Sequence, residues 1–255
     1  MRIVVVGGTG LIGSKVVEQL RATPHEVVAA SRATGVNAYT GTGLAEALDG
    51  ASVLVDVSNS DYLDEAGSLD YFDTETLNLL TYGAAAGVRH HVALSIVGTD
   101  RLAAGGGGYF RGKQLQEQLI RRSGRAFSIV HSTQFFEFIP RIADAALDGQ
   151  HTKVVQTLMQ PIAGDDTAAA VVEAALGSPT GGTVEVAGPE RAPLADFVQR
   201  WFGRGDHVRP VEVDPLARYF GSRLRDGDLL PGPDARLSTL TYRDWLERET
   251  ASHPV

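Results

Sequence analysis

The chain has 255 residues, of which 43% are hydrophobic, and this is enough for one large α/β domain with a sizeable buried core. Its net charge of −8 argues against nucleic acid as a partner, because the phosphate backbone would be repelled. The absence of cysteine excludes disulfides and thiolate metal sites, and no metal-binding motif is found. The N-terminal apolar run ends at Val6, too soon for a signal peptide or a membrane span. We therefore expect a cytoplasmic protein with no membrane partner, and the sequence does not indicate its oligomeric state.

Short β-branched runs alternate with longer amphipathic stretches through the first half, which is typical of βαβ units and a parallel sheet. The predicted strands cover residues 2–6, 26–30, 36–40, 52–57, 91–96 and 126–130. The predicted helices cover residues 11–22, 44–48, 69–87 and 109–123. The third strand conflicts with its link, because five residues are fewer than the dozen or so that a parallel crossover needs.

The pattern loosens after about residue 132, where a smaller unit is expected. Helices are predicted at 135–147, 167–176, 194–202 and 239–249, with short strands at 154–156, 160–164 and 182–188. The sequence thus predicts an α/β fold, a doubly wound parallel sheet (Rossmann) with a small C-terminal substrate lobe. Residues 1–190 form the dinucleotide-binding domain, with a continuous core over 1–131 and late strands to about 188. Residues 191–255 form the lobe, and 132–160 contribute to it.

A glycine-rich turn between the first strand and the first helix predicts a dinucleotide site. Gly7, Gly10 and Gly13 are spaced G-x-x-G-x-x-G. The first allows a tight turn, the second lets the backbone approach a pyrophosphate, and the third lets the helix pack on the sheet. Free N–H groups at the helix N-terminus favour the phosphates. The expected contacts are Gly7, Gly8, Thr9, Gly10, Leu11, Ile12 and Gly13.

The end of the second strand indicates which dinucleotide binds. NAD sites usually place a carboxylate there for the ribose hydroxyls, whereas this strand ends in Ser31 and Arg32. A guanidinium and a hydroxyl suit a 2′-phosphate, because arginine makes forked hydrogen bonds to phosphate. The sequence therefore predicts NADP (NADPH) as the cofactor.

Several segments together resemble a known superfamily. They are GGTGLIG, the Ser-Arg pair, VDVSNS, TLNLLTYGAAAGVRHHVALSIVG and the K-x-x-x-E of Lys113 and Glu117. In combination they resemble the atypical short-chain dehydrogenases/reductases over about residues 1–190. The NmrA-like, NAD(P)H-binding oxidoreductase branch is the nearest in pattern. The resemblance implies a cofactor across the carboxyl ends of the strands and a substrate lobe from the C-terminal part.

The resemblance also implies a catalytic set of Ser95, Tyr109 and Lys113, which match the order of serine, tyrosine and lysine in tyrosine-dependent members. A free phenol has a pKa near ~10, and a neighbouring ammonium lowers it. Residues four apart share a helix face, so Lys113 can lie beside Tyr109 and also reach the nicotinamide ribose. Ser95 would orient the substrate carbonyl that receives the tyrosine proton. An alternative is that only the lysine works, as a cofactor contact, with Tyr109 a solvated residue at the start of its helix.

Further contacts with the cofactor are expected from two segments that follow strands. Ser58 and Asn59 follow the fourth predicted strand, at the edge where open α/β sheets bind ligands. By resemblance, Thr133, Gln134 and Phe135 border the nicotinamide and the substrate. His131 stands where many relatives carry arginine, so anion binding there is not expected.

The sequence leaves three functions open. The first is an NADP-dependent oxidoreductase that acts on a small carbonyl, quinone or enone compound. The second is an NADP(H)-binding regulator or redox sensor without turnover, and the third is an epimerase, isomerase or cyclase on the same fold. The glycine run at 105–108, just before Tyr109, is interpreted as a flexible lid over the substrate.

Overall fold

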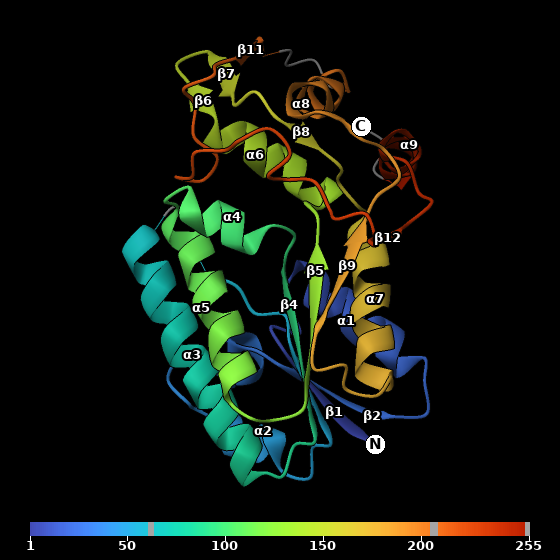
Figure 1. Cartoon of the computed structure of the whole chain (residues 1–255). Helices are drawn as coiled ribbons and strands as arrows, with labels where there is room; N and C mark the ends of the chain where they lie inside the picture. The colour runs from blue at the N-terminus through green and yellow to red at the C-terminus, as the bar shows by residue number, and fades with distance from the viewer. Residues whose placement is uncertain (61–63, 205–208, 253–255) are drawn as a thin grey trace.

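A computed structural model describes residues 1–60, 64–204 and 209–252. Within them, seven parallel strands form one sheet between two layers of helices, with a smaller lobe above the carboxyl ends of the strands (Figure 1). From edge to edge the strands are β12 (Arg236–Leu237), β9 (Thr183–Ala187), β5 (Phe127–Ser132), β4 (His90–Ile96), β3 (Val53–Asp56), β1 (Arg2–Val6) and β2 (Glu26–Ala30). The predicted doubly wound parallel sheet is confirmed.

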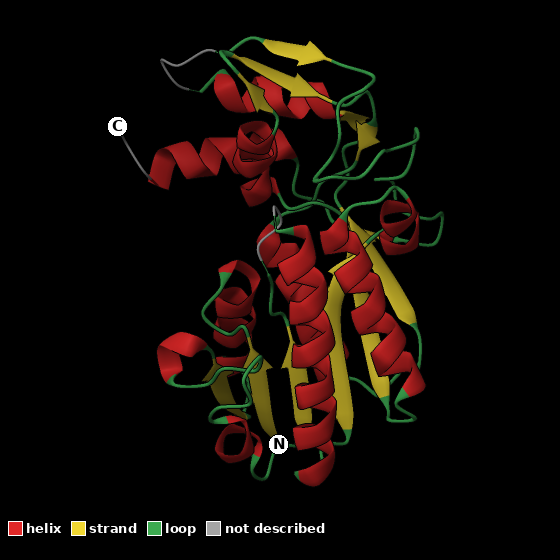
Figure 2. Cartoon of the chain, turned by 90° about the vertical axis from the view of Figure 1, so that its left-hand side faces the viewer, coloured by secondary structure: helices red, strands yellow, loops and turns green. Residues whose placement is uncertain are grey.

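The alternation of side chains along β1 explains why both faces of the sheet are covered. Ile3 and Val5 pack in the core beneath α1 (Leu11–Arg21) and α7 (Gly164–Leu176), while Val4 and Val6 pack in the core beneath α2 (Leu44–Leu48) and α3 (Glu65–Ala85). Figure 2 shows helices stacked in front of the sheet, on the face that α3 and α5 (Gly108–Arg122) cover. The short α4 (Thr99–Ala104), which the sequence did not predict, precedes α5.

The predicted strand over residues 36–40 is wrong. The chain turns through a 3-10 helix, η1 (Arg32–Thr34), and makes only an isolated bridge between Asn37 and Thr42 before α2 begins. The short link cannot hold the crossover that a further parallel strand needs, so β2 forms the edge of the sheet. The topological switch therefore lies between β1 and β3, and the turns after these two strands flank the ligand-binding crevice.

The lobe draws on two parts of the chain. Its elements are η2 (Phe136–Phe138), α6 (Ile139–Ala145), β6 (Leu147–Asp148), β7 (His151–Val154), β8 (Leu158–Met159), β10 (Ala192–Pro193), α8 (Leu194–Phe202), β11 (Val211–Val213) and α9 (Tyr242–Ser252). After β11 the chain returns to the sheet as β12, which pairs with β9. The predicted boundary near residue 190 is therefore only partly right, because 236–237 belong to the sheet.

None of the helices in the described ranges is long and apolar enough to cross a membrane.

Candidate active site

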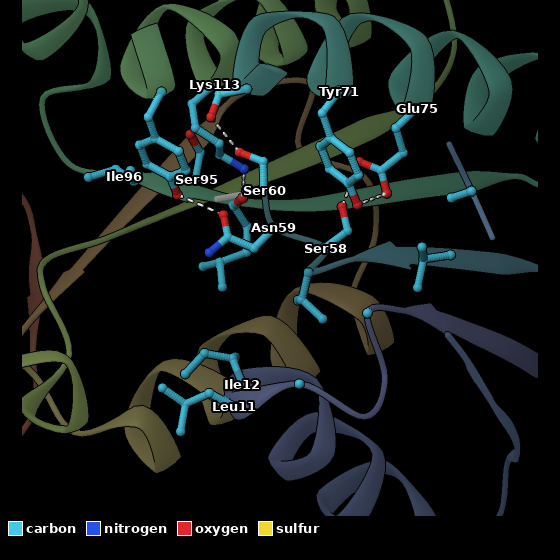
Figure 3. A pocket seen from close by; sticks show the side chains of 18 of the residues that line it. Leu11, Ile12, Ser58, Asn59, Ser60, Tyr71, Glu75, Ser95, Ile96 and Lys113 are labelled. Carbon is cyan, nitrogen blue, oxygen red and sulfur yellow. Dashed lines mark hydrogen bonds between the residues drawn. The ribbon is translucent and has the colours of Figure 1, made fainter. Parts of the chain in front are cut away.

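One cavity of about 920 Å³ lies where the sheet meets the lobe. It extends from the turn after β1, past the ends of β3, β4 and β5, to the first turn of α5 and the segment after β11. Figure 3 shows Leu11 and Ile12 on one side and Tyr71, Glu75 and Lys113 on the opposite side. All but two of the predicted site residues line this cavity, and those two are Gly8 and Gly13.

The turn after β1 has the geometry of a phosphate cradle. Gly7 has a φ of +78°, which favours glycine, and a side chain there would lie 2.8 Å from the backbone nitrogen of Ser58. A side chain at Gly13 would overlap the Gly7 carbonyl oxygen, so this glycine lets α1 sit close to the turn. No side chain caps α1 and its first turn has no acidic residue, which leaves its N–H groups for an anion. Gly8 and Gly13 do not line the cavity but allow the close backbone packing that forms the cradle, since a side chain at Gly8 would lie 2.7 Å from Val5 O.

Ser31 and Arg32 lie at the end of the cavity next to β2. Arg32 is exposed, and its guanidinium makes no hydrogen bond or ion pair with any other described residue. The Ser31 hydroxyl is buried and likewise has no partner among the described residues. A positive charge and an unsatisfied hydroxyl at one end of a cavity fit a phosphate group.

Two further buried polar atoms without a partner in the described part of the chain line the cavity after β5. They are Thr133 Oγ1 and Gln134 Oε1, and both side chains are less than a tenth exposed. A buried polar group without a hydrogen bond is costly, so such groups indicate a missing ligand. Phe135 lines the same stretch and supplies an apolar surface. A donor, an acceptor and a ring face fit a nicotinamide with its carboxamide.

Lys113 lines the cavity but is almost fully buried. Its ammonium donates to Leu94 O at 2.7 Å and to Gln116 Oε1 at 2.5 Å, and it lies 4.9 Å from the centre of the Phe72 ring. Burial lowers the pKa of Lys113, and the carboxylates of Asp56, Glu117 and Glu75 oppose that shift. An ammonium has three protons, so one N–H is not used by these two hydrogen bonds.

Ser95 is committed to a partner below the cavity. Its hydroxyl donates to Glu117 Oε1 at 2.6 Å, and His131 Nε2 lies 2.8 Å from the same oxygen. Burial alone would raise the pKa of Glu117, but the hydrogen bonds and charge of His131 and the hydrogen bond from Ser95 bring it to about 2. Glu117 is therefore an ionised carboxylate, and it accepts the hydrogen bond from the Ser95 hydroxyl. Ser95 lines the cavity as predicted, and its role in orienting a substrate carbonyl stays a prediction.

Tyr109 lies on the second position of α5, one helical turn before Lys113, and is buried in the cavity wall. Its hydroxyl donates to Asn59 Oδ1 at 2.9 Å. The predicted tyrosine on α5 and the predicted turn after β3 therefore meet in one hydrogen bond. Tyr109 is buried, so its interpretation as a solvated residue is wrong, whereas the alternative that only the lysine works stays a prediction.

A buried pair of acidic residues lies under the turn after β3. Ser58 Oγ is 2.7 Å from both Asp56 Oδ1 and Glu75 Oε2. A serine hydroxyl has one proton and can donate to only one of these oxygens, so the other contact requires a proton on a carboxyl group. Burial raises the pKa of Glu75 to about 8, with a further contribution from the Asp56 carboxylate. Glu75 is thus a neutral acid at neutral pH.

This neutral acid predicts how stability depends on pH. The unfolded chain releases the Glu75 proton near the ordinary pKa of 4.5, whereas the folded protein keeps this proton until the pH approaches about 8. The free energy of unfolding should therefore fall as the pH rises through this window. Glu75→Gln, which cannot ionise, is expected to remove most of that decline. Urea unfolding across the window tests this, with Glu18→Gln on the exposed face of α1 as the control. An equal decline in Glu75→Gln would contradict the assignment.

The glycine run at 105–108 is not a slack loop. A side chain at Gly105 would overlap Arg223 O, and one at Gly107 would lie 2.6 Å from Ser222 Oγ. Arg223 N donates to Gly105 O at 2.9 Å, and Gly107 N donates to Ser222 Oγ at 3.0 Å. The lid interpretation is therefore wrong, because these glycines let the backbone after β11 dock closely between α4 and α5.

Sequence reasoning missed the polar side chains that hold the site from below. Gln116 donates from Nε2 to Asp56 Oδ2 at 2.7 Å while its oxygen accepts from Lys113, so it links the lysine to the end of β3. Glu75 completes this layer, together with Glu117, which the sequence had indicated only as part of the resemblance. The available signal was Asp56 itself, a carboxylate within the otherwise apolar strand VLVDV.

Residues 3–95 match the family model described as the NAD dependent epimerase/dehydratase family. No curated protein matches the chain significantly. Among solved structures, MoeE5 in complex with UDP-glucose and NAD is 17% identical, with a TM-score of 0.69 over 97% of this chain and 92% of that one.

Two other solved structures are similar in fold. A short-chain dehydrogenase/reductase superfamily protein from Agrobacterium tumefaciens with bound NAD is 18% identical, with a TM-score of 0.68 over 99% of this chain and 97% of that one. The NADPH-dependent quinone oxidoreductase QOR2 from Escherichia coli, complexed with NADPH, is 21% identical, with a TM-score of 0.64 over 84% of this chain and 78% of that one. The family match and the shared fold agree with the predicted resemblance to the short-chain dehydrogenase/reductase superfamily, and the NmrA-like branch stays a prediction.

Proposed function

We propose that this protein is an NADP(H)-dependent oxidoreductase that interconverts an uncharged carbonyl, quinone or enone compound and its reduced form. The observation that carries the proposal is a single cavity with three regions. A phosphate cradle and unsatisfied polar atoms occupy one part, Tyr109 and Lys113 the middle, and uncharged aromatic side chains the far end. The likeness to NAD- and NADPH-bound structures agrees with a nicotinamide dinucleotide in the first region.

In the proposed mechanism, Tyr109 donates its proton to the carbonyl oxygen. The Lys113 ammonium, one helical turn away, would stabilise the tyrosinate that remains, and its third N–H could hold a ribose hydroxyl of the cofactor. A bound nicotinamide supplies the hydride, and its oxidation balances the reduction of the carbonyl. Asn59 holds the tyrosine hydroxyl between turnovers, and Ser95 with Glu117 fixes the floor beneath it.

The assignment of NADP over NAD rests on Arg32 and Ser31. If Arg32 binds the 2′-phosphate, Arg32→Ala should raise the Kd for NADPH about 10- to 100-fold, since hydrogen bonds to charged groups contribute about 1.5–3 kcal/mol. The Kd for NADH should not change. Arg21→Ala, at the exposed end of α1 and away from the cavity, is the matched control. Fluorescence titration of both cofactors measures this, and equal losses for NADH and NADPH would refute the 2′-phosphate contact.

A second candidate is an epimerase acting on a nucleotide sugar, which the family match over residues 3–95 favours. The two functions differ in what the lobe must bind, because a nucleotide sugar brings its own diphosphate. Incubating the protein with NADPH and a panel of quinones, enones and aldehydes separates them by the loss of nicotinamide absorbance. Oxidation of NADPH by at least one of these compounds supports the oxidoreductase. Cofactor binding without oxidation, together with conversion of UDP-glucose, would support the epimerase.

A further inference from the structure

Lys113 is a buried ammonium that forms no ion pair with any carboxylate among the described residues. Its two hydrogen bonds go to uncharged oxygens, those of the Leu94 carbonyl and the Gln116 amide. Burial of a charge is costly unless other charges offset it. Nearby carboxylates, of which Asp56 has the largest effect, oppose the fall in the pKa of Lys113 that burial causes. The positive charge is therefore supported by carboxylates but not paired with one, and this leaves it available to a ligand in the cavity that Lys113 lines.

Gln116 stands between this ammonium and Asp56. The side chain of Gln116 is buried and does not line the cavity. Its Oε1 accepts from Lys113 Nζ at 2.5 Å, and its Nε2 donates to Asp56 Oδ2 at 2.7 Å. The orientation of the amide is fixed, because an ammonium can only donate and must face the amide oxygen. One uncharged side chain thus satisfies a buried cation and a buried acidic group at once, and it keeps the two apart.

Asp56 is the group with which the ammonium would pair if the amide were removed. Asp56 Oδ1 accepts from Ser58 N at 3.0 Å and lies 2.7 Å from Ser58 Oγ, whereas Gln116 is the one donor to Oδ2 among the described residues. Without Gln116, the ammonium and Oδ2 would each lose a partner on facing sides of the same gap. A lysine has a flexible four-carbon stem, and opposite charges attract strongly in a buried site. The ammonium would therefore move toward Asp56, which does not line the cavity.

We propose that Gln116 is a positioning residue for the dinucleotide: it holds the Lys113 ammonium away from Asp56 and so keeps the ammonium available to the nicotinamide ribose. The inference rests on the proposed function, in which Lys113 contacts that ribose, and it names the residue on which the contact depends. Gln116 does not line the cavity, so it acts only through the lysine. Binding of the adenosine half of the dinucleotide should not depend on it.

The test is a double-mutant cycle on binding, measured by calorimetry with NADP⁺ and with adenosine 2′,5′-bisphosphate, which lacks the nicotinamide ribose. Gln116→Met keeps the length of the side chain and removes both hydrogen bonds. It should raise the Kd for NADP⁺ about 3- to 10-fold and leave the Kd for the bisphosphate unchanged. Lys113→Met should raise the Kd for NADP⁺ by at least as much. In the Lys113→Met background, Gln116→Met should change this Kd less than about 2-fold, because its effect requires the lysine.

A rescue variant separates a residue that keeps two charges apart from one that merely supports the helix. Asp56→Asn removes the charge that attracts the ammonium, so adding it to Gln116→Met should return the Kd for NADP⁺ toward the wild-type value. Gln118→Met is the matched control, because Gln118 lies on the same helix and does not line the cavity. Both Kd values should stay unchanged in this control. Thermal unfolding shows which variants fold, and Gln116→Leu repeats the test if Gln116→Met does not.

The outcomes distinguish this inference from the proposed function. An unchanged Kd for NADP⁺ in the folded Gln116 variant, or equal losses for NADP⁺ and the bisphosphate, would overturn the inference and leave the proposed function standing. Additive effects of Gln116→Met and Lys113→Met, or no recovery with Asp56→Asn, would do the same. An unchanged Kd for NADP⁺ in Lys113→Met would overturn the inference together with the ribose contact of the proposed mechanism.

Discussion

Replacing Gly13 by alanine is expected to abolish dinucleotide binding and to destabilise the fold. The new side chain would overlap the Gly7 carbonyl oxygen, which is backbone and cannot rotate away. Helix α1 would have to move off the turn, at a cost near or above the upper end of the roughly 1–3 kcal/mol that overpacked positions show. Chemical denaturation and NADPH titration measure the two effects.

Gly10→Ala is the matched comparison. A side chain there would meet Gly7 O at 3.2 Å and no other atom within 4 Å, and Gly10 lines the cavity. This variant should therefore fold with nearly wild-type stability while the added methyl weakens NADPH binding. If Gly13→Ala kept wild-type stability and binding, the close approach of α1 to the turn would not be a requirement of the site.

Tyr109→Phe is expected to lower kcat by about 10²–10⁴, the usual contribution of a general acid. The ring and its contacts with Phe72 and Phe110 remain, so the Kd for NADPH should be unchanged. Loss of the hydrogen bond to Asn59 should lower the free energy of unfolding by only about 0.5–1.5 kcal/mol. Steady-state kinetics with any substrate that the panel reveals provides the measurement.

Tyr242→Phe is the control for this experiment. Tyr242 is fully buried in the lobe, does not line the cavity, and its hydroxyl has no partner among the described residues. Its removal should leave kcat unaltered. Undiminished turnover in Tyr109→Phe would remove the tyrosine from the mechanism while leaving hydride transfer intact.

The dinucleotide-binding half could be predicted because its determinants are local. The apolar run of β1, the glycine spacing and the amphipathic pattern of α1 lie within about twenty residues of one another, and each agrees with the others. The local sequence pattern over residues 36–40 led to the wrong prediction of a strand. That segment is held instead by Asn78 on α3, which donates to Ala38 O and Tyr39 O at 2.9 Å.

The candidate site also depends on contacts between residues that are far apart in the sequence. Tyr109 and Lys113 could be paired from their spacing on one helix, but the partner of Ser95 lies on α5, 22 residues away. The partner of the glycine run is still more distant, because Gly107 and Ser222 are 115 residues apart. Only packing reveals that Gly105 and Gly107 in this glycine run are places where another segment docks.

The most direct test of the proposed function is whether hydrogen moves from the cofactor to a substrate in this cavity. The measurement is mass spectrometry of the product formed from a quinone and NADPH deuterated at the nicotinamide C4, in parallel for wild type and Tyr109→Phe. With a quinone, whose hydroquinone exchanges its protons with water, we expect a primary isotope effect on NADPH oxidation. With an enone or aldehyde in place of the quinone, we expect deuterium in the product. Bound NADPH that stays unoxidised with every compound tested would contradict the account.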